Sequence, residues 1–181
     1  MEWKRTIELD IAGIKMRWKR PEFGTLKVNC DVAWNPQSHE DGAGWVIRDF
    51  VGLLHSAGGS RDMYSHSDEM PEATALRAVM QECAKEGIHS IEIETDAKTI
   101  VHMINKETGT DASLETMIHD IWNLAQTFQN ATFTYAHQKC NHAAHVVASY
   151  FSKYGDDSVP VSRSLPLNPP ALRMCPCLMK K

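Results

Sequence analysis

Apolar and polar residues alternate along residues 26–31, which read Leu-Lys-Val-Asn-Cys-Asp. This period of two is typical of a strand with one buried face, and the run ends on an acid, Asp31. Residues 43–48 and 53–58 form two further strand-like apolar runs. The polar run at 35–42 and the Asp-Phe-Val-Gly segment at 49–52 separate the three runs and predict turns. The pattern therefore predicts three antiparallel strands, the first of which ends at Asp31.

Helical spacing begins near Pro71, which suits a first helical turn, and Gly87 is a fitting stop. Alternation over residues 88–93 predicts a fourth strand that leads to Asp96. The later pattern predicts helices over 97–105, 114–128 and 141–154, with a fifth strand over 131–136. The order β-β-β-α-β-α-α-β-α predicts an α/β fold in which a five-stranded mixed sheet, antiparallel and then parallel, is flanked by helices.

Both ends of the chain lack a sustained period. We interpret residues 1–24 as a leader or linker and residues 25–155 as one domain. Residues 156–181 carry five prolines, and we expect a disordered or loosely attached tail.

Composition fits a soluble globular domain, with 43% hydrophobic and 23% charged residues in 181. The sequence has neither an 18-residue apolar run nor a secretory signal, so we expect no membrane contact. Its five cysteines have no framework spacing, which favours reduced thiols in an intracellular protein, nuclear or cytoplasmic. We expect a monomer.

The net charge of −4 does not indicate a protein that binds nucleic acid through a positively charged surface overall. The two ends of the sequence are basic and its middle is acidic. This distribution would suit binding of a polyanion whose phosphates contact cations bound by the acidic residues, and it is equally typical of ordinary solvated surface charge.

Three acids stand at the ends of predicted elements. Asp31 closes the first strand, Glu72 opens the first long helix and Asp96 follows the fourth strand. A right-handed crossover would place the fourth strand parallel to the first and bring the acids together. Carboxylates gathered in this way repel one another unless a hard cation such as Mg²⁺ binds them, and paired metals can activate water for phosphodiester cleavage. Taken singly, each acid fits a turn, a cap or a helix-dipole position at least as well.

Several segments resemble one family in the right order. They are Trp-Lys-Arg-Pro at 18–21 with Lys-Val-Asn-Cys-Asp at 27–31, Ala-Gly-Trp-Val-Ile-Arg-Asp at 43–49, Glu-Ala at 72–73, Glu-Thr-Asp at 94–96 and Asn-His-Ala-Ala-His-Val-Val-Ala at 141–148. Together they resemble the ribonuclease H fold, and more closely the reverse-transcriptase-like ribonuclease H domain of plant and retroelement-related proteins. The resemblance implies an endoribonuclease that cuts the RNA strand of RNA–DNA hybrids with two Mg²⁺ or Mn²⁺ ions. By position it makes Asp31, Glu72 and Asp96 metal ligands and catalytic residues, with His145 at the fourth acidic position of the family.

The chain departs from the family pattern near these acids. Val32 stands where the family usually has Gly, and Ala97 stands where Ser commonly follows the third acid. His145 replaces an acid, and a neutral imidazole prefers softer ions than Mg²⁺. These departures motivate an alternative function as a weakened or inactive module that binds nucleic acid or protein. A related exonuclease that uses the same acids is a third hypothesis. For substrate contact we assign Val32, Ala33, Trp34, Ala97 and Asn141.

Other candidate residues carry weaker signals. Trp34 follows Asp31 in a polar context and is the better candidate for stacking on a base, whereas Trp45 fits a core position. We interpret His137 as a surface residue. His142 and His145 are spaced by one helical turn but lack a third ligand. Cys175 and Cys177 could hold a soft metal, although an unstructured tail explains them more simply.

Overall fold

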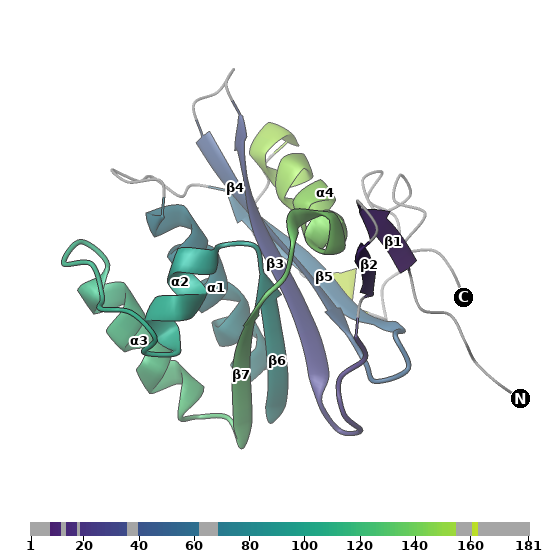
Figure 1. Cartoon of the computed structure of the whole chain (residues 1–181), viewed down its shortest axis with the longest axis horizontal. Helices are drawn as coiled ribbons and strands as arrows, with labels where there is room; N and C mark the ends of the chain where they lie inside the picture. Colours follow the sequence, from purple (N-terminus) through teal and green to yellow (C-terminus); the bar gives the residue numbers. More distant parts are fainter. Residues whose placement is uncertain are drawn as a thin grey trace, which may run out of the picture.

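A mixed sheet with the strand order β7-β6-β3-β4-β5-β8 forms the centre of the structure (Figure 1). The computed structural model describes residues 8–11, 14–17, 19–35, 40–61, 69–154 and 161–162. A separate two-stranded sheet pairs β1 (Glu8–Ile11) with β2 (Ile14–Arg17). Within the described residues, no helix is both long and apolar enough to cross a membrane.

The antiparallel half of the sheet is a meander of β3 (Leu26–Asn35), β4 (Glu40–Arg48) and β5 (Leu54–Arg61). The turn between β4 and β5 is held by Asp49, whose Oδ1 accepts hydrogen bonds from the backbone amides of Val51 and Leu53. Gly52 takes a positive φ of 86° in this turn, which glycine adopts at little cost. The two-residue strand β8 (Val161–Ser162) pairs with β5.

The parallel half is made by β6 (Ser90–Thr95), which lies alongside β3, and β7 (Asn130–Tyr135), which lies alongside β6. Helix α1 (Met70–Lys85) connects β5 to β6, while α2 (Lys98–Ile104) and α3 (Glu115–Ala125) connect β6 to β7. The last helix, α4 (Gln138–Tyr154), follows β7. The predicted five-stranded mixed sheet with flanking helices is therefore confirmed.

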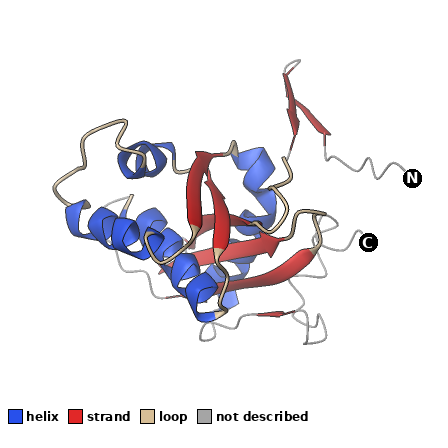
Figure 2. Cartoon of the chain, turned by 90° about the horizontal axis from the view of Figure 1, so that it is seen from below, coloured by secondary structure: helices blue, strands red, loops and turns tan. Residues whose placement is uncertain are grey.

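Helices cover both faces of the sheet (Figures 1 and 2). On one face, Trp45 and Ile47 of β4 join α1 and α3 in the larger hydrophobic core. On the other face, Val46 packs with α4 residues Val147 and Phe151 in a smaller cluster. This division follows from the strand period of two, which sends neighbouring residues to opposite faces. It also confirms that Trp45 is a core residue, with 4% of its surface exposed.

Helix α4 lies almost in backbone contact with β4. A Cβ atom built on Gly44 would lie 2.1 Å from the backbone nitrogen of Ala148, and one on Gly42 would lie 2.3 Å from that of Ser152. Only glycine fits at such an approach. Asn141 adds a second tether, because its Nδ2 donates to the Cys30 carbonyl at 2.7 Å. These contacts fix α4 against the strands.

The structure corrects two details of the sequence prediction. Asp31 does not end its strand, because the ladder continues from Val32↔Ala43 to Asn35↔Glu40. The bounds of the predicted turn over 35–42 are therefore wrong, since Asn35 and residues 40–42 belong to strands, and residues 36–39 lie outside the described residues. Strands β1, β2 and β8 were also missed, because runs of two to four residues are too short to show a period.

Two expectations stay predictions. The division into leader, domain and tail is not tested by the fold. Cys175 and Cys177, which could hold a soft metal, lie outside the described residues.

Candidate metal centre

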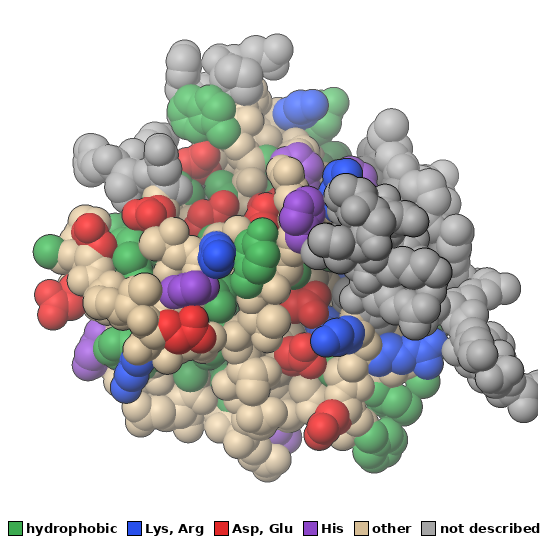
Figure 3. Space-filling view, in the orientation of Figure 1, with side chains coloured by type: hydrophobic (Ala, Val, Ile, Leu, Met, Phe, Trp, Pro, Cys, Tyr) green, Lys and Arg blue, Asp and Glu red, His purple; other side chains and the backbone are tan. Residues whose placement is uncertain are grey.

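Three acids from separate elements meet at one end of the sheet. Asp31 lies within β3, Glu72 in the first turn of α1, and Asp96 directly after β6. One carboxylate oxygen from each lies within 4.8 Å of the others. The predicted convergence of Asp31, Glu72 and Asp96 is therefore confirmed. Figure 3 shows acidic side chains and histidines side by side in the upper part of this face.

Burial and mutual repulsion raise the pKa values of these acids. Asp31 is 3% exposed, and burial together with the charge of Asp96 raises its pKa to about 7. Burial, followed by the charges of Asp31, Asp96 and Asp41, raises the pKa of Glu72 to about 8. A bound cation would offset both effects, because it favours the charged form of each carboxyl.

His145 of α4 reaches this cluster through Asp31. Its Nδ1 lies 2.8 Å from Asp31 Oδ2, and this contact lowers the pKa of Asp31 against the larger effect of burial. The Asp31 side chain is 4% exposed and that of His145 is 39% exposed, so the contact joins a buried carboxylate to a partly exposed imidazole. His145 as a metal ligand stays a prediction, since the contact shown is with Asp31. His142 is exposed, with its ring centroid 6.5 Å from that of His145.

The five residues assigned to substrate contact lie in different surroundings. Val32 and Ala97 are half-buried and pack against the larger core, and Ala33 is buried. Asn141 is fully buried and tethers α4 through the Cys30 carbonyl. Trp34 is 55% exposed, which suits a stacking residue. Substrate contact by any of the five stays a prediction. His137 is half-buried, and its Nδ1 accepts a hydrogen bond from the backbone amide of Lys139.

Sequence reasoning missed two contributions to the site. Asp41, which we placed in a turn, pairs with Trp34 across the ladder and helps to raise the pKa of Glu72. Its position could have been found only by extending the first strand past Asp31. We also missed a polar network that joins Lys27, Asn29 and Glu94, and Asn29 lies two residues before Asp31 in β3.

The donor set of the cluster fits a hard divalent cation. Asp31, Glu72 and Asp96 offer carboxylate oxygens, which are the ligands that Mg²⁺ and Mn²⁺ take in proteins. The raised pKa values of Asp31 and Glu72 show that the cluster lacks enough positive charge of its own. These residues could hold a divalent ion that neutralises them and binds phosphate oxygens.

Comparisons with known proteins agree with this fold. A family model described as Reverse transcriptase-like matches residues 29–151, which include all three acids and His145. No curated protein matches the chain.

Solved ribonuclease H structures share the fold at low identity. RNase H1 from Halobacterium salinarum is 20% identical over 70% of this chain and 96% of its own, with a TM-score of 0.63. The N-terminal RNase H domain of a Mycobacterium tuberculosis protein is 14% identical over 72% and 95%, with a TM-score of 0.65. LC11-RNase H1, isolated from compost, was solved in complex with an RNA/DNA hybrid and is 16% identical over 69% and 93%, with a TM-score of 0.59. The sheet and helices described above thus have a ribonuclease H-like fold.

Proposed function

Because this chain belongs to the Reverse transcriptase-like family, we propose that it is a divalent-metal-dependent endoribonuclease that cleaves the RNA strand of RNA–DNA hybrids. The observation that carries the proposal is the convergence of Asp31, Glu72 and Asp96 within 4.8 Å. The complex of LC11-RNase H1 with an RNA/DNA hybrid supports the substrate class. We further propose two Mg²⁺ ions, with Mn²⁺ as a substitute, and a retroelement-related, plant-type subfamily.

In this proposal Asp31, Glu72 and Asp96 hold the metal, which when bound supplies an activated water and stabilises negative charge on the leaving oxygen. The chain's own residues position and tune that site. His145 holds one Asp31 oxygen through Nδ1, which orients the carboxylate and lowers its pKa. Glu72 enters from a helix N-terminal turn, where the helix dipole favours its charged form.

Substrate would approach from the exposed side of the cluster. Trp34 offers a ring on which a base can stack, and the backbone near Val32 and Ala97 would pass close to the hybrid. We propose that the enzyme acts as a monomer inside the cell, in the nucleus or the cytoplasm.

The direct test is cleavage of a labelled RNA–DNA hybrid with Mg²⁺ or Mn²⁺. Wild type should cut the RNA strand internally, and chelation should stop the reaction. Asp31→Asn should abolish cleavage while leaving the circular dichroism spectrum unchanged, because it removes a ligand charge without changing side-chain size. Glu115→Gln is the matched control, since Glu115 is an exposed acid at the start of α3. Cleavage that survives Asp31→Asn would refute the mechanism. Products that shorten only from strand ends would indicate an exonuclease instead.

A second candidate is a module that binds nucleic acid or protein without cleaving it. The observation that favours it is His145, which stands at the family's fourth acidic position and bonds to Asp31. Such a module would bind the hybrid with salt-sensitive affinity and show no turnover in either metal. Robust metal-dependent turnover would exclude it.

A further inference from the structure

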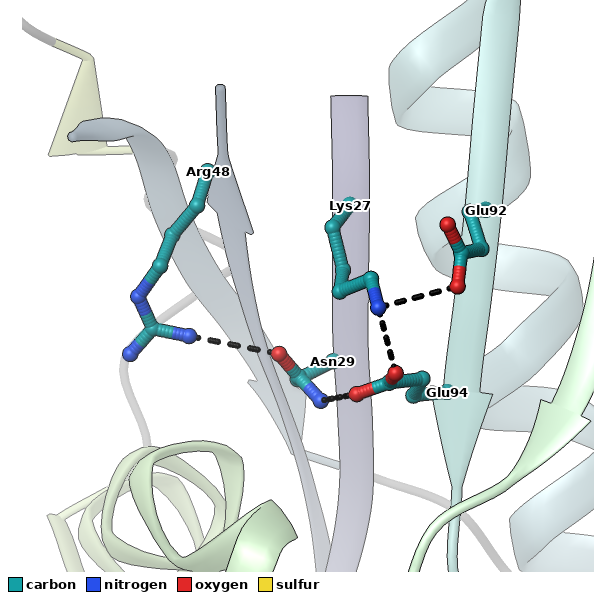
Figure 4. Close-up of polar contacts among 5 residues, drawn as sticks. All are labelled: Lys27, Asn29, Arg48, Glu92 and Glu94. Carbon is teal, nitrogen blue, oxygen red and sulfur yellow. Dashed lines mark hydrogen bonds and ion pairs between the residues drawn. The ribbon is translucent and has the colours of Figure 1, made fainter. Parts of the chain in front are cut away.

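A network of buried polar side chains crosses three strands beside the acidic cluster (Figure 4). The Lys27 side chain is 0% exposed, and its Nζ lies 2.5 Å from Glu94 Oε1 and 2.9 Å from Glu92 Oε1. Asn29 Nδ2 donates to the other Glu94 oxygen at 3.0 Å. Arg48 of β4 donates to Asn29 Oδ1 at 3.2 Å. The network thus ties β4, β3 and β6 together.

The register of β3 and β6 links this network to the metal centre. Lys27 is level with Glu92, and Asn29 is level with Glu94. Two residues beyond this last paired position, Asp31 still lies in β3 and Asp96 follows the end of β6, and their carboxylate oxygens lie within 4.8 Å of each other. Lys27 attracts Glu92, and Asn29 donates a hydrogen bond to Glu94. The next two residues along this direction, Asp31 and Asp96, instead repel each other.

We propose that Lys27, acting through Glu94, is a positioning residue that fixes β3 against β6 and so keeps Asp31 and Asp96 at the spacing a shared cation needs. The inference rests on the metal site proposed above. In the metal-free protein the charges of Asp31, within β3, and Asp96, after β6, would push these two segments apart. The buried lysine, held by the Glu92 and Glu94 carboxylates of β6, opposes that separation.

The direction in which Lys27→Met changes the Mn²⁺ affinity distinguishes the positioning role from a general electrostatic effect. Lys27→Met removes a positive charge near the acids, so long-range electrostatics alone would strengthen cation binding. Loss of positioning would weaken it. We expect Lys27→Met to weaken Mn²⁺ binding at least tenfold, as measured by electron paramagnetic resonance on protein that circular dichroism shows to be folded. Lys85→Met is the matched control, because Lys85 forms an exposed pair with Glu82 and should change the affinity less than twofold.

A double variant separates positioning from stability. Lys27→Met leaves the carboxylate of Glu94 buried without its lysine, which destabilises the fold. Adding Glu94→Gln removes that charge and should recover part of the urea midpoint, whereas Mn²⁺ affinity should stay at least tenfold reduced. The proposal is overturned if Lys27→Met leaves the affinity unchanged or strengthens it, or if affinity recovers in step with stability.

Failure of the metal site itself would look different. If the wild-type protein bound no Mn²⁺, the proposed function would be refuted. The effect of Lys27 on the spacing of β3 and β6 would then be measured in the metal-free protein. Nuclear Overhauser contacts between the Asn29 and Glu94 backbones should then weaken in Lys27→Met and persist in Lys85→Met. Contacts of wild-type strength in Lys27→Met would refute the positioning role.

Discussion

Asp31 of β3 and His145 of α4, 114 residues apart in the chain, are joined by a 2.8 Å contact between Oδ2 and Nδ1. The contact links Asp31 to α4, which packs on the opposite face of the sheet from α1. It also offsets part of the repulsion from Asp96, because His145 lowers the pKa of Asp31 whereas Asp96 raises it. His145 of α4 therefore acts on the acidic cluster through Asp31.

Removing this imidazole should raise the pKa of Asp31 above about 7, since the chief group that lowers it would be lost. We expect His145→Ala to show this rise in an NMR titration of the Asp31 carboxyl carbon in metal-free protein. The lost hydrogen bond should also reduce the free energy of unfolding by about 1 kcal/mol, which is the usual net contribution of one intramolecular hydrogen bond. His89→Ala, which changes an exposed histidine before β6, should do neither. An Asp31 pKa that stays the same or falls would contradict the assignment.

The raised pKa values also predict how stability depends on pH. Asp31 and Glu72 titrate near 7 and 8 when folded, against 3.8 and 4.5 for free carboxyls. Between about pH 4 and pH 8 the folded, metal-free protein therefore binds more protons than the unfolded chain, and its free energy of unfolding falls as pH rises. Urea unfolding at pH 5 and pH 8 should show this loss, and Asp31→Asn should make it smaller. The idea fails if wild type and Asp31→Asn have the same pH dependence.

Mg²⁺ should reverse the loss of stability at high pH. A ligand that binds only the folded state stabilises it by about 2.7 kcal/mol at a hundredfold excess over Kd. The effect should be larger at pH 8 than at pH 5, because protonated Asp31 and Glu72 bind cations poorly. Thermal unfolding with and without Mg²⁺ at both pH values measures it, and Glu72→Gln should reduce the shift at pH 8. Equal shifts at both pH values would show that the ion binds elsewhere.

Hydrophobic periodicity predicted most of the fold because the central strands and α1 each show their period over several residues. The convergence of Asp31, Glu72 and Asp96 could be predicted because a right-handed crossover through α1 places β6 parallel to β3. Periodicity could not place Asp41, because Val32, Ala33 and Trp34 continue β3 only when β4 is present to pair with them. The contact of His145 with Asp31 depends on how α4 packs, and a single helix pattern does not contain that information.

Close packing of α4 on β4 predicts an intolerant glycine. Gly44→Ala would place Cβ 2.1 Å from the Ala148 nitrogen, so the helix that carries His145 would have to move. We expect a loss of at least about 1–3 kcal/mol in the free energy of unfolding by urea denaturation, as for other overpacked sites. Gly109→Ala is the control, because nothing lies within 4 Å of a Cβ there and the change should be within about 0.5 kcal/mol. Equal effects at the two positions would contradict the packing argument.

Trp34 gives a prediction for substrate binding. It is 55% exposed on β3 and lies level with Asp41, whose charge reaches Glu72, so its ring lies at the same end of the sheet as the acids. If a base stacks on it, Trp34→Ala should lose about 1–3 kcal/mol of binding, which corresponds to a roughly 5- to 150-fold higher KM for the hybrid, with kcat within about twofold. Trp34→Phe should retain most of the affinity, because it keeps an aromatic face. Phe23→Ala is the control, since Phe23 is an 86% exposed aromatic that precedes β3, at the opposite end of that strand from Trp34. A KM unchanged by Trp34→Ala would exclude stacking, and a fall in kcat alone would instead place the residue in the chemical step.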